Sequence, residues 1–295
     1  MKKFFMFAAA ALMAVSFVSC NKDDEGKDDE VNGKVEIKTA AENLVAYFGF
    51  EAKDVLGEGI TLDGTKGAGS LDEAGFIGKC YANTAKLNTQ EAYVKYNLAA
   101  KNAIRSLESF TFTAWMNLPA DKEAKGAIMS LNGTGVEPVW PSWVFLFDNL
   151  YKNEDDGKYY QQFNGRMDFL TVDGKPALWP NCAAVELNTK DKWFQIARTY
   201  DAATGHWANY CDGILINEGD FLIDEKPVGG VNACVADDCN ALYLGGWASR
   251  IEGKASDGWL NYFCGSIDEV RFFNKALSAE ELVALRREEL AISLQ

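Results

Sequence analysis

Residues 265–282 read GSIDEVRFFNKALSAEEL, and this stretch says most about the fold class. Its first half is rich in β-branched and aromatic side chains, a composition typical of a β-strand. Ser278 is followed three positions later by Glu281, which is the spacing of a capping box at the start of a helix. The sequence therefore predicts a strand over 265–273 that leads through a turn into a short C-terminal helix.

The rest of the chain predicts further short strands. The chain holds only 6 prolines, and its β-branched or aromatic runs are separated by turns rich in glycine, aspartate and asparagine, which is typical of an antiparallel sandwich. The dipeptides Asp173-Gly174 and Asp212-Gly213 favour tight hairpin turns. The predicted strands are Leu44–Phe50, Ala92–Tyr96, Ser109–Met116, Ala127–Leu131, Trp143–Phe147, Arg166–Val172, Trp193–Tyr200, His206–Cys211, Ala241–Leu244 and Gly265–Phe273.

Several segments, taken in order, resemble one protein family. They are Leu44–Phe50, Ser109–Trp115, Trp193–Asp201, Tyr210–Gly213, Leu242–Gly246 and the closing stretch 265–282. This set resembles the LamG-like jelly-roll domains of the concanavalin A-like lectin/glucanase superfamily. The resemblance implies an all-β fold over residues 43–290, an antiparallel two-sheet jelly-roll sandwich with a short C-terminal helix. Residues 291–295 would be a tail, and residues 135–179 match no element of the family.

The N-terminal region predicts export and anchoring. Residues 1–19 combine two lysines with an apolar run, which predicts a signal peptide. Phe17 to Cys20 resembles a lipobox, so Cys20 would be the lipidated first residue of the mature chain; a plain secretory signal is the alternative. Residues 20–42 begin with a strongly acidic run and predict a disordered tether. The run also resembles the acidic tag of lipoproteins displayed on the cell surface from the outer membrane.

The charge balance limits the partners. The chain has 29 Lys and Arg against 43 Asp and Glu, a net charge of −14. Nucleic acids and anionic membrane surfaces attract basic patches, so this balance disfavours both, and it disfavours polyanionic glycans as well. A neutral glycan or a glycoprotein fits better, and contact with the membrane would run through the lipid anchor alone.

The cysteines indicate an exported chain. Six follow Cys20, and an even number permits three disulfides. Cys234 and Cys239 enclose four residues and are the predicted local pair. Several of the others lie in strand-like segments, so buried free thiols are the alternative. A zinc site is disfavoured because the chain has one histidine and no paired C-x-x-C motif.

The resemblance also implies a metal. In the family a calcium ion often ties the opening loop to the final strand, and the matching positions are Asp54 and Asp268. Strand alternation would place Asp268 and Val270 on one face and Glu269 and Arg271 on the other. A carboxylate beside apolar strand residues needs a partner. That partner would be calcium, or else Asp268 caps a turn or pairs with an arginine.

Catalytic motifs are weak. Related glucanases carry an E-x-D-x-x-E strand, and no such triplet is present. His206 is most simply a surface residue of a hairpin, and no serine nucleophile motif accompanies it. The enzymatic alternative is a glycoside hydrolase or lyase whose acids come from the unmatched segment. Those acids are Asp148, Glu154, Asp155, Asp156 and Asp168.

Aromatic side chains give the positive prediction. Of the eight tryptophans, Trp115, Trp193 and Trp207 lie on matched strands and predict packing, whereas the others lie in or beside turns. Flat rings on loops can stack on sugar rings while amides bind their hydroxyls. The predicted sugar platform comprises Trp140, Trp179, Trp247, Tyr159, Tyr160 and Gln162. The alternative is that such rings close one end of the sandwich, and burial is favoured for Trp143.

The sequence therefore predicts non-catalytic binding of a glycan or glycoprotein by an anchored sandwich. The alternatives are the hydrolase or lyase above and an adhesion module that binds protein partners. An exposed apolar patch in place of a polar groove would favour the adhesion module.

Overall fold

The computed structural model describes residues in eleven ranges, and every structural statement below refers to them. They are 36–51, 55–85, 87–119, 125–133, 143–152, 154–155, 159–170, 176–178, 183–186, 192–227 and 239–295. Contacts group Val35–Gln295 into one compact unit. Among the described helices none is long and apolar enough to cross a membrane.

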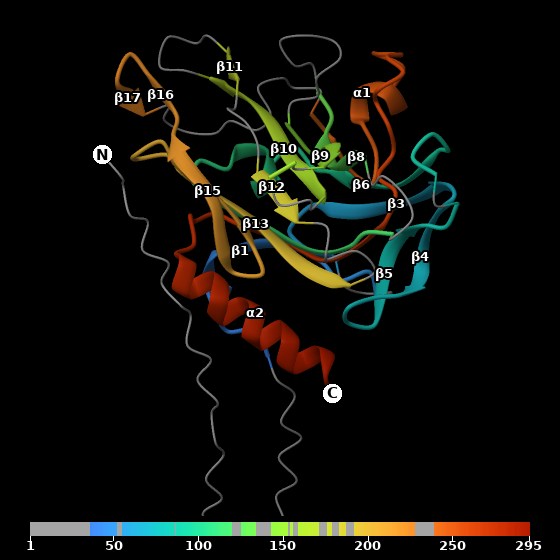
Figure 1. Ribbon diagram of the computed structural model, residues 1–295, viewed down its shortest axis with the longest axis horizontal. Coiled ribbons are helices and arrows are strands. Elements are labelled where there is room, and N and C mark those ends of the chain that lie inside the picture. Colours follow the sequence, from blue (N-terminus) through green and yellow to red (C-terminus); the bar gives the residue numbers. More distant parts are fainter. Residues whose placement is uncertain are drawn as a thin grey trace, which may run out of the picture. The chain divides into compact units, whose positions relative to one another are not determined.

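The larger of the two main sheets contains nine strands of the described chain (Figure 1). The strand order along its main path is β15-β14-β13-β7-β19-β1-β2, and the β4–β5 hairpin joins it through β19. The strands are β1 (Leu44–Phe48), β2 (Val55–Leu56), β4 (Gly69–Ala74), β5 (Lys79–Asn83), β7 (Phe110–Asn117), β13 (Trp193–Asp201), β14 (His206–Cys211), β15 (Ile214–Asp220) and β19 (Ser266–Phe273).

The smaller main sheet contains eight described strands in the order β11-β10-β9-β8-β18-β6-β3, with β12 also paired to β10. They are β3 (Ile60–Gly67), β6 (Ala92–Leu98), β8 (Gly126–Leu131), β9 (Trp143–Lys152), β10 (Tyr159–Leu170), β11 (Pro176–Leu178), β12 (Ala183–Glu186) and β18 (Ala241–Leu244). A two-stranded ribbon, β16 (Leu222–Ile223) with β17 (Lys226–Pro227), lies outside both sheets. The short helices are η1 (Ala41–Asn43), η2 (Ala103–Ser106) and α1 (Ala248–Ile251).

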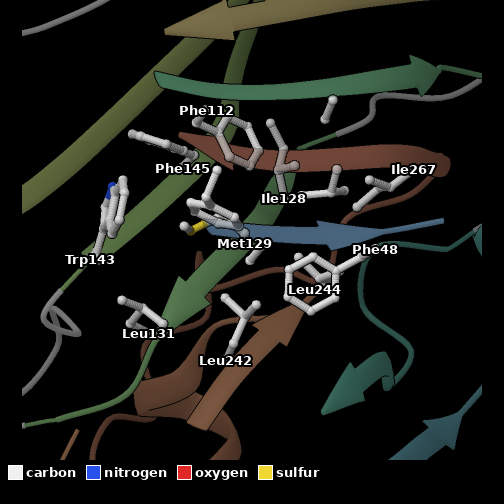
Figure 2. Packing of buried hydrophobic residues seen from close by; sticks show 14 of the residues in the cluster. Phe48, Phe112, Ile128, Met129, Leu131, Trp143, Phe145, Leu242, Leu244 and Ile267 are labelled. Atoms are coloured by element: carbon white, nitrogen blue, oxygen red, sulfur yellow. The ribbon is translucent and has the colours of Figure 1, made fainter. Parts of the chain in front are cut away.

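The two main sheets pack face to face around one apolar core. Side chains from both sheets interdigitate there, as Figure 2 shows for Phe48, Phe112, Met129 and Phe145. Trp143 is fully buried in this core, with its ring 5.0 Å from that of Phe110, which confirms its predicted burial. Antiparallel pairing, two layers and this core define the predicted jelly-roll sandwich.

The C-terminal helix α2 (Ala279–Ser293) lies on the outer face of the larger sheet (Figure 1). The capping box is present, because the Ser278 hydroxyl accepts the Glu281 N–H and the Glu281 carboxylate accepts the Ser278 N–H. Leu282 and Leu285 pack into a second apolar cluster on this face. The helix continues past residue 290, so the predicted tail of residues 291–295 mostly belongs to it.

The opening of the domain also lies earlier than residue 43. Ile37 packs against the apolar cluster beneath α2, and Thr39 donates to the Glu288 carboxylate at 3.0 Å. The described part of the predicted tether, from residue 36 on, is therefore bound to the sandwich.

The predicted hairpin at Asp212-Gly213 joins β14 to β15. Asp212 and Gly213 have φ values of 53° and 76°, which is the left-handed backbone of a type I′ turn. The hairpin predicted at Asp173-Gly174 lies outside the described residues.

Candidate functional site

The predicted sugar platform is described only in part. Trp140 and Trp179 lie outside the described residues. The backbone places Tyr159, Tyr160 and Gln162 on β10, which pairs with β9 and β12 in the smaller sheet, and the structure describes nothing of their side chains. Their role in ligand binding stays a prediction.

Trp247 does not offer an open ring. Its side chain is only 1% exposed and packs with Val144, Leu146 and Leu260 on the outer face of the smaller sheet. The prediction that Trp247 stacks on a sugar is therefore wrong for this structure. The chain around Trp247 folds back across the sheet, so its indole is enclosed although it follows a turn.

Trp259, and not Trp247, has the solvent-exposed ring. Its side chain is 41% exposed in a turn closed by the Leu260 N–H, which donates to the Asp257 carbonyl at 3.1 Å. The Trp259 ring meets Trp247 edge to face, with centroids 5.4 Å apart and planes at 88°. Because Trp247 is locked in an apolar cluster, it supports the exposed indole from beneath. We call the surface around this ring the Trp259 face.

Arg250 lies next to the Trp259 face, and a further ion pair lies on the loop that precedes it. Arg250 donates to the Leu260 carbonyl, and its guanidinium lies 4.8 Å from the centre of the Tyr262 ring. Lys254 and Glu252 form an ion pair at 3.1 Å on the same loop. An exposed ring bordered by hydrogen-bonding groups is the arrangement that stacks on a sugar ring and binds its hydroxyls. The Asp-Gly-Trp turn at 257–259 was the sequence signal for this exposure.

Asp268, the predicted calcium ligand of the last strand, is fully buried. Its Oδ2 accepts the Ile77 N–H at 2.9 Å and its Oδ1 accepts the Glu269 N–H at 2.8 Å. Burial, reinforced by the nearby Glu269 carboxylate, raises the pKa of Asp268 to about 9. The carboxyl thus holds the loop before β5, as the turn-capping alternative predicts.

The predicted alternation at Asp268 is also wrong. Val270 packs in the main core, whereas Asp268, Glu269 and Arg271 all lie outside that core. The reason is a bulge in β19: the register to β7 shifts between Asp268 and Arg271, and Glu269 has φ 50°. A bulge adds a residue and reverses the alternation beyond it.

The described residues do not fit a calcium ion at this position. Both Asp268 oxygens are engaged by backbone N–H groups, and calcium requires six or more oxygen ligands. Among the described residues no three histidine, cysteine, aspartate or glutamate side chains gather to hold a metal. Asp54, the other predicted ligand, lies outside the described residues, so the paired site stays a prediction on which nothing below depends.

A buried ion cluster beneath α2 contains the remaining enclosed carboxylates. Arg271 donates to Glu269 Oε2 at 2.5 Å and also to Glu289 Oε1. The Trp115 indole N–H donates to Glu289 Oε2 at 2.6 Å, and Gln195 donates to the same atom. Burial raises the pKa of Glu289 to about 7, against the opposing effect of Arg271. We call these residues, with Tyr47, the Arg271 cluster.

The Arg271 cluster is structural. Glu269 and Glu289 are at most 1% exposed, and both bind one guanidinium, so neither can reach a glycosidic oxygen. Among the acids of the enzymatic alternative, Glu154 and Asp155 are exposed in a turn. Asp156 and the side chains of Asp148 and Asp168 lie outside the described residues.

His206 lies on β14 near the hairpin ends, as predicted. Its Nδ1 is 3.0 Å from Asp220, and its Nε2 is 3.4 Å from Glu218, both on the neighbouring strand β15. The imidazole side chain is 43% exposed, so the contacts are those of a surface cross-strand pair.

The cysteines divide between a disulfide and thiols. Cys239 is disulfide-bonded. Cys234 lies outside the described residues, so the predicted pairing of the two stays a prediction. Cys80, Cys211 and Cys264 carry thiols. Three disulfides are therefore not formed, and burial raises the pKa of the Cys80 and Cys211 thiols to about 12.

Comparison with known families agrees with this geometry. Residues 88–283 match the family described as the concanavalin A-like lectin/glucanases superfamily. The match covers more than half of the chain, so this protein belongs to that family. No curated protein sequence matches the chain.

Solved structures support the fold. The receptor-binding domain of botulinum neurotoxin mosaic serotype C/D matches with a TM-score of 0.51 and 12% identity, covering 83% of this chain and 51% of that one. The binding domain of a paraclostridial mosquitocidal protein matches with a TM-score of 0.49 and 15% identity, covering 83% and 52%. This chain thus spans about half the length of these structures, and at such identities the first likeness shows the fold alone. A fold of this family is compatible with a binding role.

Proposed function

We propose that this protein is a cell-surface lipoprotein that binds a neutral glycan, or the glycan of a glycoprotein, without catalysis. The observation that carries the proposal is the Trp259 face, where an indole 41% exposed is supported by the buried Trp247. Among the tryptophans whose side chains the structure describes, Trp259 is the one with the largest exposed fraction. A ring supported in this way loses little conformational freedom when it stacks on a sugar.

The charge of the chain supports a neutral ligand. A net charge of −14 repels sulfated and other acidic glycans over most of the surface. The Lys254 charge, on the loop that precedes Trp259, is paired with Glu252. The hydroxyl groups of a neutral sugar can bind to groups of either charge and to backbone carbonyls. A neutral sugar is therefore the better ligand for this face.

The proposed anchor explains how a weak site would serve. A lipid on Cys20 and a tether reaching to about residue 35 would hold many copies at one surface. Linked sites bind a repeating glycan with an effective concentration that exceeds each single affinity. A shallow face such as that of Trp259 would therefore act through many weak contacts.

Binding to a panel of immobilised neutral polysaccharides tests the proposal. The purified domain should be retained. Trp259→Ala should lower its affinity by about tenfold or more, because stacking of a ligand on an aromatic ring contributes on the order of 1–3 kcal/mol. Trp259→Phe, which keeps a flat ring, should retain most of the binding. Trp140→Ala and Trp179→Ala, measured beside it, test the remaining platform residues. Equal retention of wild type and Trp259→Ala would refute the role of this face.

A further inference from the structure

A partly open pocket lies on the outer side of the larger sheet. It is a pocket of about 380 Å³ at the place where β5, β7 and β13 meet the start of β19. Its lining includes Glu73, Asn83, Asn117, Trp193, Gly265 and Ser266. This volume lies within the range of sites for small ligands. We call it the Trp193 pocket.

Trp193 faces this pocket because of strand alternation. Phe194 and Ile196 point into the main core, so Trp193 and Gln195 point to the outer face. Gln195 is covered by α2 through its bond to Glu289, whereas the pocket lining contains no residue of α2. Trp193 is therefore half-buried, and the expectation that it only packs against the sheet is incomplete.

Neighbouring rings hold the Trp193 indole in place. The Phe76 ring lies 6.3 Å from it and is itself stacked on Trp115 at 3.6 Å. Trp115 is fixed in turn by its hydrogen bond to Glu289. The wall of the pocket is thus a rigid aromatic surface that stays partly open to solvent.

The opposite wall is preformed by Asn83. Its Nδ2 donates to the Leu87 and Phe263 carbonyls, and its Oδ1 accepts the Ala85 N–H at 3.1 Å. A Cβ on Gly265 would lie 2.6 Å from the Asn117 carbonyl, so the glycine permits the close approach of the strands. Ligand binding would therefore require little rearrangement of the pocket.

Two polar groups at the pocket remain unused. The side-chain amide of Asn117 and the carboxylate of Glu73 form no hydrogen bond with any described residue, although both line the pocket. The amide can donate and accept, and the carboxylate accepts. The lining contains no lysine, arginine or histidine, so an anionic ligand would find no counter-charge there.

We propose that the Trp193 pocket is a second carbohydrate-binding site, which takes a neutral sugar residue. The indole of Trp193 stacks on the apolar face of the sugar ring, while Asn117 and Glu73 bind its hydroxyls. The ligand class rests on the proposed function, but the site is separate from the Trp259 face, since the two lie on the outer sides of different sheets. Two sites on one domain would let it bind two residues of one glycan or bridge two glycans.

Indole N–H signals in ¹H–¹⁵N NMR spectra test this site directly, because each tryptophan side chain gives its own signal. The probes are glucose, galactose, mannose and N-acetylglucosamine, added to the ¹⁵N-labelled domain. Trp193→Phe and Trp259→Phe identify the two signals while keeping a ring in each place. At least one sugar should shift the Trp193 signal in a saturable way.

Paired variants test the hydrogen bonds. Asn117→Ala should lower the sugar affinity, measured from the titration of the Trp193 signal, by about tenfold. This is the effect of losing one to two hydrogen bonds. Asn97→Ala makes the same change at an exposed strand position of the smaller sheet and should leave the affinity unchanged. An equal effect of both variants would overturn the role of Asn117 and with it this pocket geometry.

The two signals separate the outcomes. A shift at Trp193 alone supports the pocket and refutes the Trp259 face. A shift at Trp259 alone overturns the pocket and leaves the proposed function standing. No shift at either indole with any of the sugars overturns both.

Discussion

The outer faces of the two sheets both have apolar packing beneath their covers, but only the larger sheet also has a buried ion cluster there. On the larger sheet, helix α2 is held by the Arg271 cluster, in which one guanidinium joins two buried carboxylates. On the smaller sheet, residues around Trp247 cover β8 and β9 through apolar packing and through two hydrogen bonds of the Ser130 hydroxyl, with the Gly246 carbonyl and the Ala248 N–H. Each cover stops short of one tryptophan, so Trp193 and Trp259 are left partly exposed.

This difference shows how one sandwich can present two aromatic sites. Neither ring is exposed because its own residue type demands it. Each is exposed because the covering segment ends beside it, and each contacts a second ring, which is the half-buried Phe76 for Trp193 and the buried Trp247 for Trp259. The free energy of unfolding should therefore depend on pH and on charge at the Arg271 cluster. Around Trp247 it should depend on the volume of the buried side chains.

The largest effect is expected from Arg271→Met, which removes the cation but keeps an extended side chain. Glu269 and Glu289 would then face each other buried and unpaired, at a cost of about 3–5 kcal/mol in the free energy of unfolding. Urea denaturation at pH 7 measures this cost. The deficit should shrink toward pH 4, because protonation removes the unpaired charges. A loss that stays below about 1 kcal/mol at pH 7 would mean that the cluster does not hold α2.

A smaller loss is expected from Trp247→Ala on the opposite face. Removing a buried indole from its apolar cluster should cost about 3 kcal/mol, and this cost should not change between pH 5 and pH 8. Trp259→Ala is the matched control, since an exposed ring should change stability by no more than about 0.5 kcal/mol. Thermal and urea unfolding of both variants would sharpen the comparison. Equal losses in the two would show that Trp259 is part of the packing and not a free platform.

The last effect is a slope with pH at Asp268, which per pH unit is smaller than either of these losses. Its folded-state pKa is raised to about 9, above an unfolded value of about 4, so its stabilising contribution is complete below pH 4 and is lost as the pH rises toward 9. Asp268→Asn cannot lose a proton. The free energy of unfolding of Asp268→Asn should therefore rise relative to that of the wild type as the pH rises from 5 to 8. The rise should be at most about 1.4 kcal/mol per pH unit.

Stability curves at several pH values measure that slope. Asp72→Asn is the control, because Asp72 is an exposed carboxylate whose pKa is lowered by its hydrogen bond to Lys79. It should not reproduce the gain with rising pH. Parallel curves for wild type and Asp268→Asn would show that the Asp268 carboxyl is ionised when buried.

Local signals in the sequence predicted local structure well. The Ser278 to Glu281 capping box and the Asp212-Gly213 turn were both found, because each depends on a few neighbouring residues. Most predicted strands were found within a few residues of their ends. The sequence did not reveal the bulge at Glu269, because a strand read alone has no partner from which a register shift could be seen.

Exposure of the tryptophans was the least predictable feature. Strand alternation could have placed Trp193 outward with Gln195, yet it could not show that α2 covers only the second of them. Trp247 and Trp259 lie in segments that are similarly rich in turn-forming residues, and only Trp247 is buried.

The amino-acid sequence by itself determined the family, the two-layered fold and the way its last strand enters a capped helix. The family follows from the ordered resemblance of several segments, whereas the strands and the helix cap follow from residue composition and turn chemistry, which act over a few residues. Tertiary structure alone decided which indoles meet solvent and which carboxylates share Arg271. Burial depends on segments that are distant in the sequence, such as Trp115 and Glu289, which are 174 residues apart and meet on one sheet face.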